Sequence, residues 1–98
     1  MFQLRDKYCI VGIGETDYSK QSGRTVLDLA SEACGKAIND AGLTPEEIDG
    51  LVSFHFNDSV PATAVATSLG IPQAMYAVDF AGGGDAGDLI VLSAIAAL

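Results

Sequence analysis

A cluster of glycines constrains this chain more than any other feature. The cluster, Gly82-Gly83-Gly84-Asp85-Ala86-Gly87, follows a strand-like run at 75–80 and precedes a helical run at 88–98. A strand that leads through glycines into a helix brings backbone N–H groups against a ligand, because the first N–H groups of a helix have no partner within it. Such a bend suits an anion, or an oxygen that becomes negative during a reaction. Residues 81–90 include no Cys, Ser, Thr, Lys or His, so the bend lacks a nucleophile of its own.

The rest of the chain alternates between strand-like and helix-like segments. Short apolar runs rich in β-formers predict strands at 8–13, 51–56 and 75–80. Apolar residues at helical spacing predict helices at 25–41, 61–69 and 88–98, with a short helical turn at 44–48. Thr25 stands at an N-cap, and Gly42 and Gly70 stand just past helix ends, where a left-handed residue is favoured. The order β-α-β-α-β-α predicts an α/β fold with a mostly parallel sheet that binds ligands at the carboxyl ends of its strands.

Length and charge limit the classes of protein to which the chain can belong. Ninety-eight residues suffice for one small domain, and the net charge of −8 argues against nucleic acid or an anionic membrane surface as a partner. No apolar run approaches the roughly 20 residues that span a bilayer, and no signal peptide is expected. Cys9, in the first predicted strand, and Cys34, in the first predicted helix, are expected to be free core thiols, which fits a reducing cytoplasm.

The final helical run, Leu-Ile-Val-Leu-Ser-Ala-Ile-Ala-Ala-Leu at 89–98, is apolar on all sides. This pattern is typical of a helix that is buried all round. A free domain of this size could not easily cover it. We therefore expect the chain to be the N-terminal piece of a larger fold, or to need a second chain that covers this helix.

Two further motifs are weaker. Gly12-Ile-Gly14 after the first predicted strand resembles the start of a dinucleotide-binding fingerprint, but Asp17 occupies the position of its third glycine, and a carboxylate there would repel a pyrophosphate. A tight turn after a buried strand is the simpler interpretation of Gly12 and Gly14. His55 is the only histidine, and Asp58 lies three residues further on.

For each of these polar residues a catalytic or binding role competes with a structural one. His55 could act as a base beside Asp58, although a histidine that packs or hydrogen-bonds within a loop is the simpler interpretation. Asp85 and Asp88 could hold a water or a ligand, although carboxylates near a helix N-terminus are favourable in any case. No spacing of His, Cys, Asp and Glu suggests a metal site.

Three segments carry a resemblance to a known family. They are I-V-G-I-G-E-T-D-Y-S-K at 10–20, K-A-I-N-D-A-G-L at 36–43 and T-P-E-E-I-D-G-L-V at 44–52. Together they resemble the N-terminal part of the thiolase superfamily, in the branch of lipid-transfer proteins and sterol-carrier-protein-type thiolases. The resemblance covers essentially the whole chain. It implies that residues 1–98 form the incomplete N-terminal part of a thiolase-like domain with a layered αβαβα fold, and that the protein is a homodimer.

The family resemblance also implies a reaction. Gly84 lies nearest to the position of the reactive cysteine of thiolases, so no acyl-enzyme can form there. Cys-lacking members of this branch are aldolases that cleave the side chain of steroid-derived acyl-CoA thioesters, together with a partner that carries an OB-fold and a zinc ribbon. By this resemblance, the thioester would lie at Gly82, Gly83, Gly84, Asp85 and His55, while acid and base groups would come from elsewhere.

In this interpretation the CoA thioester is the substrate, and no covalently bound cofactor or metal is expected. Two alternatives remain open at this point. One is a non-catalytic carrier or scaffold for lipids or CoA thioesters. The other is an oxidoreductase of the Rossmann type, which Asp17 disfavours.

Overall fold

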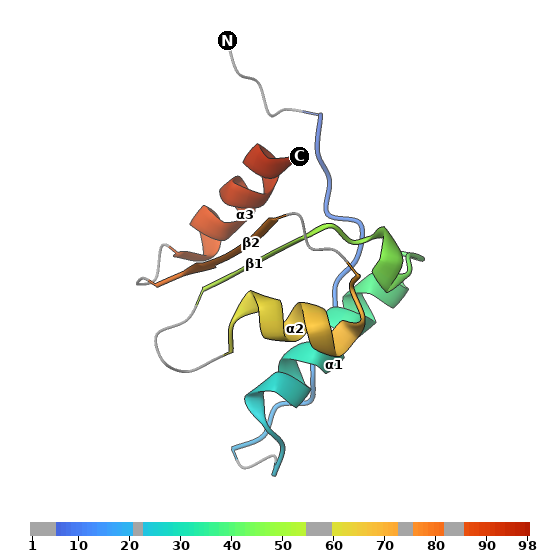
Figure 1. Cartoon of the computed structure of the whole chain (residues 1–98), viewed down its shortest axis with the longest axis vertical. Helices are drawn as coiled ribbons and strands as arrows, with labels where there is room; N and C mark the ends of the chain where they lie inside the picture. Colours follow the sequence, from blue (N-terminus) through green and yellow to red (C-terminus); the bar gives the residue numbers. More distant parts are fainter. Residues whose placement is uncertain (1–5, 21–22, 55–59, 73–75, 82–85) are drawn as a thin grey trace.

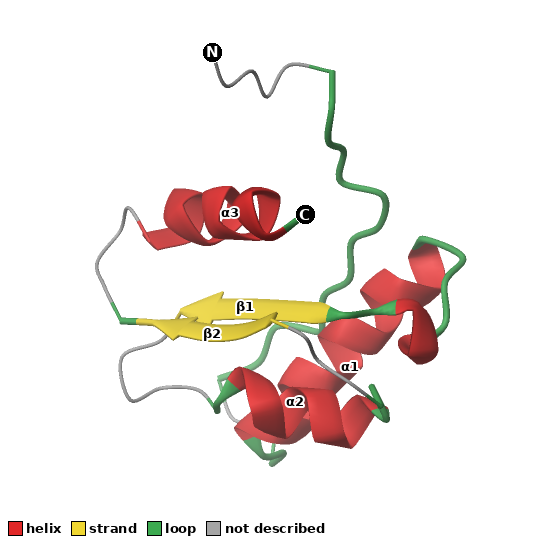
Figure 2. Ribbon diagram, turned by 45° about the horizontal axis from the view of Figure 1, so that its top comes forward, coloured by secondary structure: helices red, strands yellow, loops and turns green. Residues whose placement is uncertain are grey.

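Within the described residues, the computed structural model contains a two-stranded parallel sheet between helices (Figures 1 and 2). It describes residues 6–20, 23–54, 60–72, 76–81 and 86–98. The elements, in chain order, are α1 (Val26–Asp40), the 3-10 helix η1 (Pro45–Glu47), β1 (Gly50–Phe54), α2 (Ala62–Leu69), β2 (Tyr76–Phe80) and α3 (Ala86–Ala97). Figure 2 shows α3 on one face of the sheet and α2 with α1 on the other, so the chain folds in the α/β manner that the alternating pattern predicts.

Strand pairing decides which side chains face which helix. β1 and β2 pair in parallel from Gly50 with Tyr76 to Phe54 with Phe80. The hydroxyls of Tyr76 and of Ser93 in α3 share a hydrogen bond of 2.8 Å, so alternate residues from Tyr76 face α3. The intervening residues, which include Ser53 and Asp79, face α2.

The helix ends confirm the predicted caps. The Thr25 hydroxyl oxygen accepts a hydrogen bond of 3.1 Å from the backbone N–H of Asp28. The carboxylate of Asp28 accepts a hydrogen bond from Arg24. Gly42 and Gly70 both have a φ of +74°, the left-handed conformation that side chains disfavour. The predicted turn at 44–48 is η1, where the backbone N–H of Thr44 donates to a carboxylate oxygen of Glu47 at 3.1 Å.

The core forms around α2, which lies between the sheet and α1. Its buried apolar residues are, within the described part of the chain, Ala62, Val65, Ala66 and Ile71. The Ser31 hydroxyl of α1 donates to the Ser68 hydroxyl of α2 at 2.8 Å and so joins the two helices. The core is small because it depends on one eight-residue helix with short side chains.

The predicted strand at 8–13 is wrong. This segment is extended but unpaired, and Figure 1 shows it as a coil that passes α1. The backbone N–H of Ile13 donates to an Asp40 carboxylate oxygen at 3.0 Å, so a helix side chain takes the place of a neighbouring strand. An apolar β-forming run becomes a strand only beside a free sheet edge, and here the segment packs on α1.

The packing on α1 leaves much of this segment exposed to solvent. The side chains of Ile10 and Ile13 are 79% and 76% exposed, and Cys9 is exposed as well. The expectation that Cys9 lies in the core is therefore wrong, whereas Cys34 is half-buried within α1. Both cysteines are free, as predicted.

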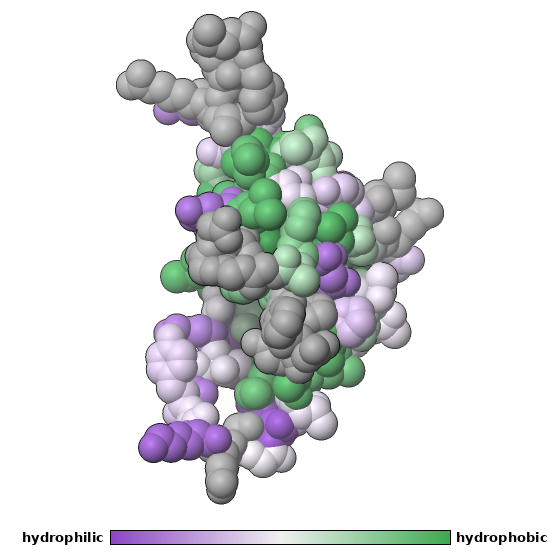
Figure 3. Space-filling view, turned by 90° about the vertical axis from the view of Figure 1, so that its left-hand side faces the viewer, coloured by the Kyte–Doolittle hydropathy of each residue, from purple (hydrophilic) through white to green (hydrophobic). Residues whose placement is uncertain are grey.

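The last helix is not completely covered within the described chain, as expected for a free domain of this size. Leu89, Val91 and Leu92 of α3 are each about half exposed. Figure 3, which faces the side where α3 lies in Figure 1, shows hydrophobic surface over much of that face. Only one side of α3 packs on the sheet, so its other apolar side chains remain in contact with solvent. No helix in the described ranges combines the length and the apolar content needed to cross a membrane.

Candidate functional site at the carboxyl edge of the sheet

The two segments with the predicted site residues leave the sheet at one edge. β1 ends at Phe54 and β2 ends at Phe80, and these two residues are register partners. We call this end of the sheet the carboxyl edge. The predicted residues themselves lie outside the described residues: His55, Asp58, Gly82, Gly83, Gly84 and Asp85. Their roles therefore stay predictions, but the strand ends to which their segments are attached lie side by side, as the parallel sheet requires.

The start of α3 lies next in the chain after the glycine cluster. Gly87 is in the first turn, and a side chain built there would have no described atom within 4 Å. Asp88, also in the first turn, is exposed to solvent. A carboxylate in this position favours the helix through its partial positive end, so the structural interpretation of Asp88 suffices.

One carboxylate connects three elements at the carboxyl edge. A single oxygen of Asp79, the penultimate residue of β2, accepts a hydrogen bond of 2.6 Å from the Ser53 hydroxyl of β1. The same oxygen accepts a hydrogen bond of 2.9 Å from the backbone N–H of Ala62, the first residue of α2. The ends of both strands and the start of a helix therefore meet at one atom.

Asp79 and Ser53 are site residues that the sequence analysis did not single out. A signal was present, because Asp is disfavoured in strands and the run Tyr76–Phe80 is otherwise apolar or aromatic. An acidic residue in such a place indicates a specific partner. The partner's identity is not apparent from the sequence, since Ser53 lies 26 residues away and Ala62 lies 17 residues away.

The Gly12–Gly14 motif does not reach the carboxyl edge. Both glycines lie against α1: a side chain at Gly12 would come within 2.9 Å of the Ala41 Cβ, and one at Gly14 would meet the Ala33 carbonyl oxygen. Residues 11–19 form no turn, so the expected tight turn is wrong, and close backbone packing on α1 explains both glycines. A dinucleotide fingerprint requires a helix that begins directly after its glycines. Residues 15–20 contain no such helix.

Two hollows on the described surface lie away from the carboxyl edge. The first, of about 520 Å³, lies between α3 and the amino ends of the strands, with Asp49, Gly50 and Tyr76 on the sheet side. The second, of about 560 Å³, lies between residues 13–15 and the last turns of α1. Near it, the Tyr18 hydroxyl donates to a Glu15 carboxylate oxygen at 2.9 Å, and this hydrogen bond raises the pKa of Tyr18.

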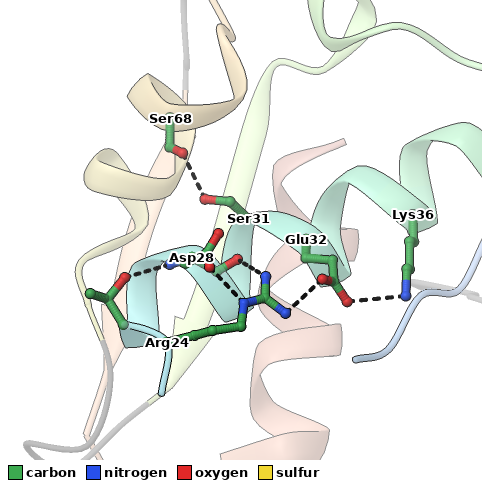
Figure 4. Close-up of polar contacts among 7 residues, drawn as sticks. Arg24, Asp28, Ser31, Glu32, Lys36 and Ser68 are labelled. Atoms are coloured by element: carbon green, nitrogen blue, oxygen red, sulfur yellow. Dashed lines mark hydrogen bonds and ion pairs between the residues drawn. The ribbon is translucent and has the colours of Figure 1, made fainter. Parts of the chain in front are cut away.

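A row of charged side chains follows α1, and we call Arg24, Asp28, Glu32 and Lys36 the charge ladder (Figure 4). The Arg24 guanidinium contacts the Asp28 carboxylate at 2.6 Å and the Glu32 carboxylate at 2.7 Å, and the Lys36 ammonium contacts Glu32 at 3.0 Å. Hydrogen bonds from Lys36 and then Arg24 lower the pKa of Glu32, and the hydrogen bond from Arg24 lowers the pKa of Asp28. The ladder stabilises the surface of α1.

The described ranges contain two free cysteines, the exposed Cys9 and the half-buried Cys34. Within these ranges, no group of three or more His, Cys, Asp or Glu side chains is arranged to hold a metal ion. Burial raises the pKa of the Cys34 thiol, which keeps it protonated and unreactive at neutral pH. The described part of the carboxyl edge offers the hydrogen-bonded side chains of Ser53 and Asp79.

Comparison with known proteins finds similarity to enzymes that are named for the cleavage of steroid side chains. No protein-family model matches it. It is 47% identical, over 73 residues, to the 17-hydroxy-3-oxo-4-pregnene-20-carboxyl-CoA lyase of Mycobacterium tuberculosis, a match that covers 74% of this chain and 19% of the lyase. It is 45% identical, over 80 residues, to a steroid side-chain-cleaving aldolase of Thermomonospora curvata, a match that covers 80% of this chain and 20% of the aldolase.

The chain is also similar to a solved structure of an aldolase. The structure of an Ltp2-ChsH2(DUF35) aldolase matches with a TM-score of 0.82 and 43% identity, over 90% of this chain and 23% of that one. The chain spans about a fifth of the length of the curated relatives it matches. The homologues of this chain are thus steroid side-chain-cleaving aldolases, and the chain is similar to about one fifth of such a protein.

Proposed function

We propose that this chain is part of a thiolase-like aldolase that cleaves a carbon–carbon bond in the side chain of a steroid or related lipid held as a CoA thioester. The observation that carries the proposal is the 47% identity to a steroid-CoA lyase. The α/β arrangement, with strand ends that meet at one edge, supports a ligand site there. Residues 1–98 would form the N-terminal part of the thiolase-like domain.

The substrate in the name of that lyase defines the chemistry we propose for this chain. Its hydroxyl on C17 lies β to the thioester carbonyl carried by C20. A base removes the hydroxyl proton, the C17–O bond becomes a carbonyl, and the C17–C20 bond breaks. Its electron pair moves to C20 and is delocalised onto the thioester oxygen as an enolate. Protonation of C20 then gives propanoyl-CoA and a 17-ketosteroid, with no oxidant and no covalent cofactor.

The carboxyl edge would contribute binding rather than proton transfer. Backbone N–H groups of the glycine cluster, Gly82–Gly84, and of the α3 start could polarise the thioester oxygen, which becomes negative in the enolate. The glycines of this cluster would leave room for a bulky thioester. Asp85 and His55 would lie beside the thioester, and the acid and base groups would come from elsewhere in the protein.

Partners follow from the same proposal. The similar solved structure is named as a complex of two proteins, Ltp2 and ChsH2(DUF35). We propose that this protein likewise works with a second protein that carries an OB-fold and a zinc ribbon, and that it forms a homodimer in the cytoplasm. Light scattering of the full-length protein, with and without that partner, measures both associations.

Turnover of a defined substrate tests the function. The full-length protein and its OB-fold partner are incubated with 17-hydroxy-3-oxo-4-pregnene-20-carboxyl-CoA, and propanoyl-CoA and the 17-ketosteroid are measured by mass spectrometry. We expect both products in equal amounts. A thioester analogue without the C17 hydroxyl should bind but not react, because the retro-aldol step needs that oxygen. Tight binding of the thioester without turnover would instead support the carrier role.

A further inference from the structure

The carboxylate of Asp79 forms hydrogen bonds with two other elements. Its oxygen accepts both the Ser53 hydroxyl, at 2.6 Å, and the backbone N–H of Ala62, at 2.9 Å. Ser53 and Asp79 are register partners in the sheet, so the first bond bridges the two strands directly. The second bond connects the sheet to α2. One side chain therefore connects three elements.

The second bond replaces a local cap that α2 lacks. Pro61 stands at the N-cap, and its side chain has no oxygen to accept a hydrogen bond from the helix. The first N–H of α2 belongs to Ala62, which is only 2% exposed, so water cannot serve as its partner. Asp79 provides the acceptor from the neighbouring strand. Its negative charge also suits the partial positive end of the helix.

The contacts of Asp79 lie where the chain leaves both strands and enters α2, next to the proposed thioester site. The chain leaves β1 one residue after Ser53, leaves β2 one residue after Asp79, and enters α2 at Ala62. In the sequence, the predicted thioester-binding residues follow the two strand ends. Asp79 therefore lies at the carboxyl edge and connects the ends of β1 and β2 to the start of α2.

We propose that Asp79 is a positioning residue: it holds the ends of β1 and β2 and the start of α2 in the arrangement that the carboxyl edge needs to bind a CoA thioester. Ser53 supports it as a hydrogen-bond donor. This inference rests on the proposed thioester site and adds to it a residue that acts through others. A purely structural cap would stabilise the protein without affecting the affinity for the ligand.

The test compares two losses of a helix cap in the full-length protein with its partner. Asp79→Ala removes the acceptor at the carboxyl edge, whereas Thr25→Ala removes the N-cap of α1, a contact within that helix. The probe is the steroid CoA thioester without the C17 hydroxyl, and its Kd is measured by calorimetry well below the melting temperatures. We expect Asp79→Ala to raise Kd at least fivefold and Thr25→Ala to leave it within twofold. Asp79→Asn, which keeps an acceptor oxygen, should restore Kd to within about twofold of the wild type.

The outcomes separate this inference from the proposed function. Unchanged Kd in Asp79→Ala, with only a lower melting temperature, would overturn the positioning role. Wild-type binding without turnover would overturn the aldolase function, but the comparison of Kd values would still decide the role of Asp79. A wild type that fails to bind the thioester overturns both. Should Asp79→Ala not fold, Ser53→Ala replaces it, with a Kd raised at least twofold as the expected result and an unchanged Kd as the result that overturns the role.

Discussion

Glycines at 12, 14 and 35 show how the same residue serves different purposes in one small chain. Gly12 and Gly14 let an extended backbone lie directly on α1, where any side chain would meet helix backbone atoms. Gly35 lies inside α1, and a side chain there would find its nearest neighbour, the Leu69 Cδ2, at 3.8 Å, an ordinary contact. The first two glycines are required by the packing, whereas the third only weakens its helix.

Alanine substitutions test this difference. We expect Gly14→Ala to lower the free energy of unfolding by about 1 kcal/mol or more, because the new Cβ would come within 2.6 Å of the Ala37 backbone nitrogen and displace the segment from α1. Gly35→Ala is the matched control and should raise it by about 0.5–1 kcal/mol, since alanine favours a helix. Urea unfolding measures both. A neutral Gly14→Ala would mean that the segment does not pack on α1 in solution.

At the scale of elements, α1 is stabilised by contacts that belong to the helix itself. Thr25 caps its start, and the charge ladder follows one side over three turns. In contrast, α2 has no side-chain cap of its own and takes its acceptor from β2. The first helix can thus be recognised from local sequence, and the second depends on its surroundings.

The ladder predicts a pH dependence with a definite sign. The pKa values of Asp28 and Glu32 are lowered in the folded chain, so their contribution to stability is present above their ordinary values, near 4, and is lost as the pH falls through the lowered values. We expect Glu32→Gln to lower the urea midpoint at pH 7 and to have no effect in strong acid. Glu46→Gln, which removes an equal charge from η1, controls for net charge. A Glu32→Gln effect that persists in strong acid would contradict the ion pairs.

At the scale of the whole molecule, the described chain buries few apolar side chains and leaves many large ones exposed to solvent. Its core lies around α2, while α3 shows apolar side chains to solvent on the face away from the sheet. The hydroxyl pair of Tyr76 and Ser93 joins the other face of α3 to the sheet. The two faces of α3 therefore differ in what they contribute to this chain.

Substitutions of half-exposed side chains of α3, and of the β2 residue that bonds to α3, test that difference in the 98-residue chain. The double variant Leu89→Gln/Leu92→Gln changes half-exposed side chains and should leave the free energy of unfolding within about 0.5 kcal/mol, while it reduces the fluorescence of the apolar dye ANS. Tyr76→Phe removes a partly buried hydrogen bond and should lower stability by about 1 kcal/mol, with dye binding unchanged or increased. Unfolding of the double variant would show that the outer face is packed.

Much of this protein follows from signals that act within a few residues. Thr25, Gly42 and Gly70 mark helix ends through contacts with their near neighbours, so the positions of α1 and α2 can be read from the sequence. The alternation of elements predicts a parallel sheet, and therefore strand ends that meet at one edge. The site residues predicted at that edge stay predictions, because they lie outside the described residues.

Other features depend on which segments become neighbours in space. The run at 8–13 has the composition of a strand, but whether it pairs depends on a free sheet edge, and here α1 receives it. The partners of Asp79 lie 26 and 17 residues away, and no local pattern identifies them. Hydrogen bonds between distant residues form only once the chain has folded. The helix caps could therefore be predicted from the sequence, whereas the strand partners and the contacts of Asp79 were decided by the tertiary structure.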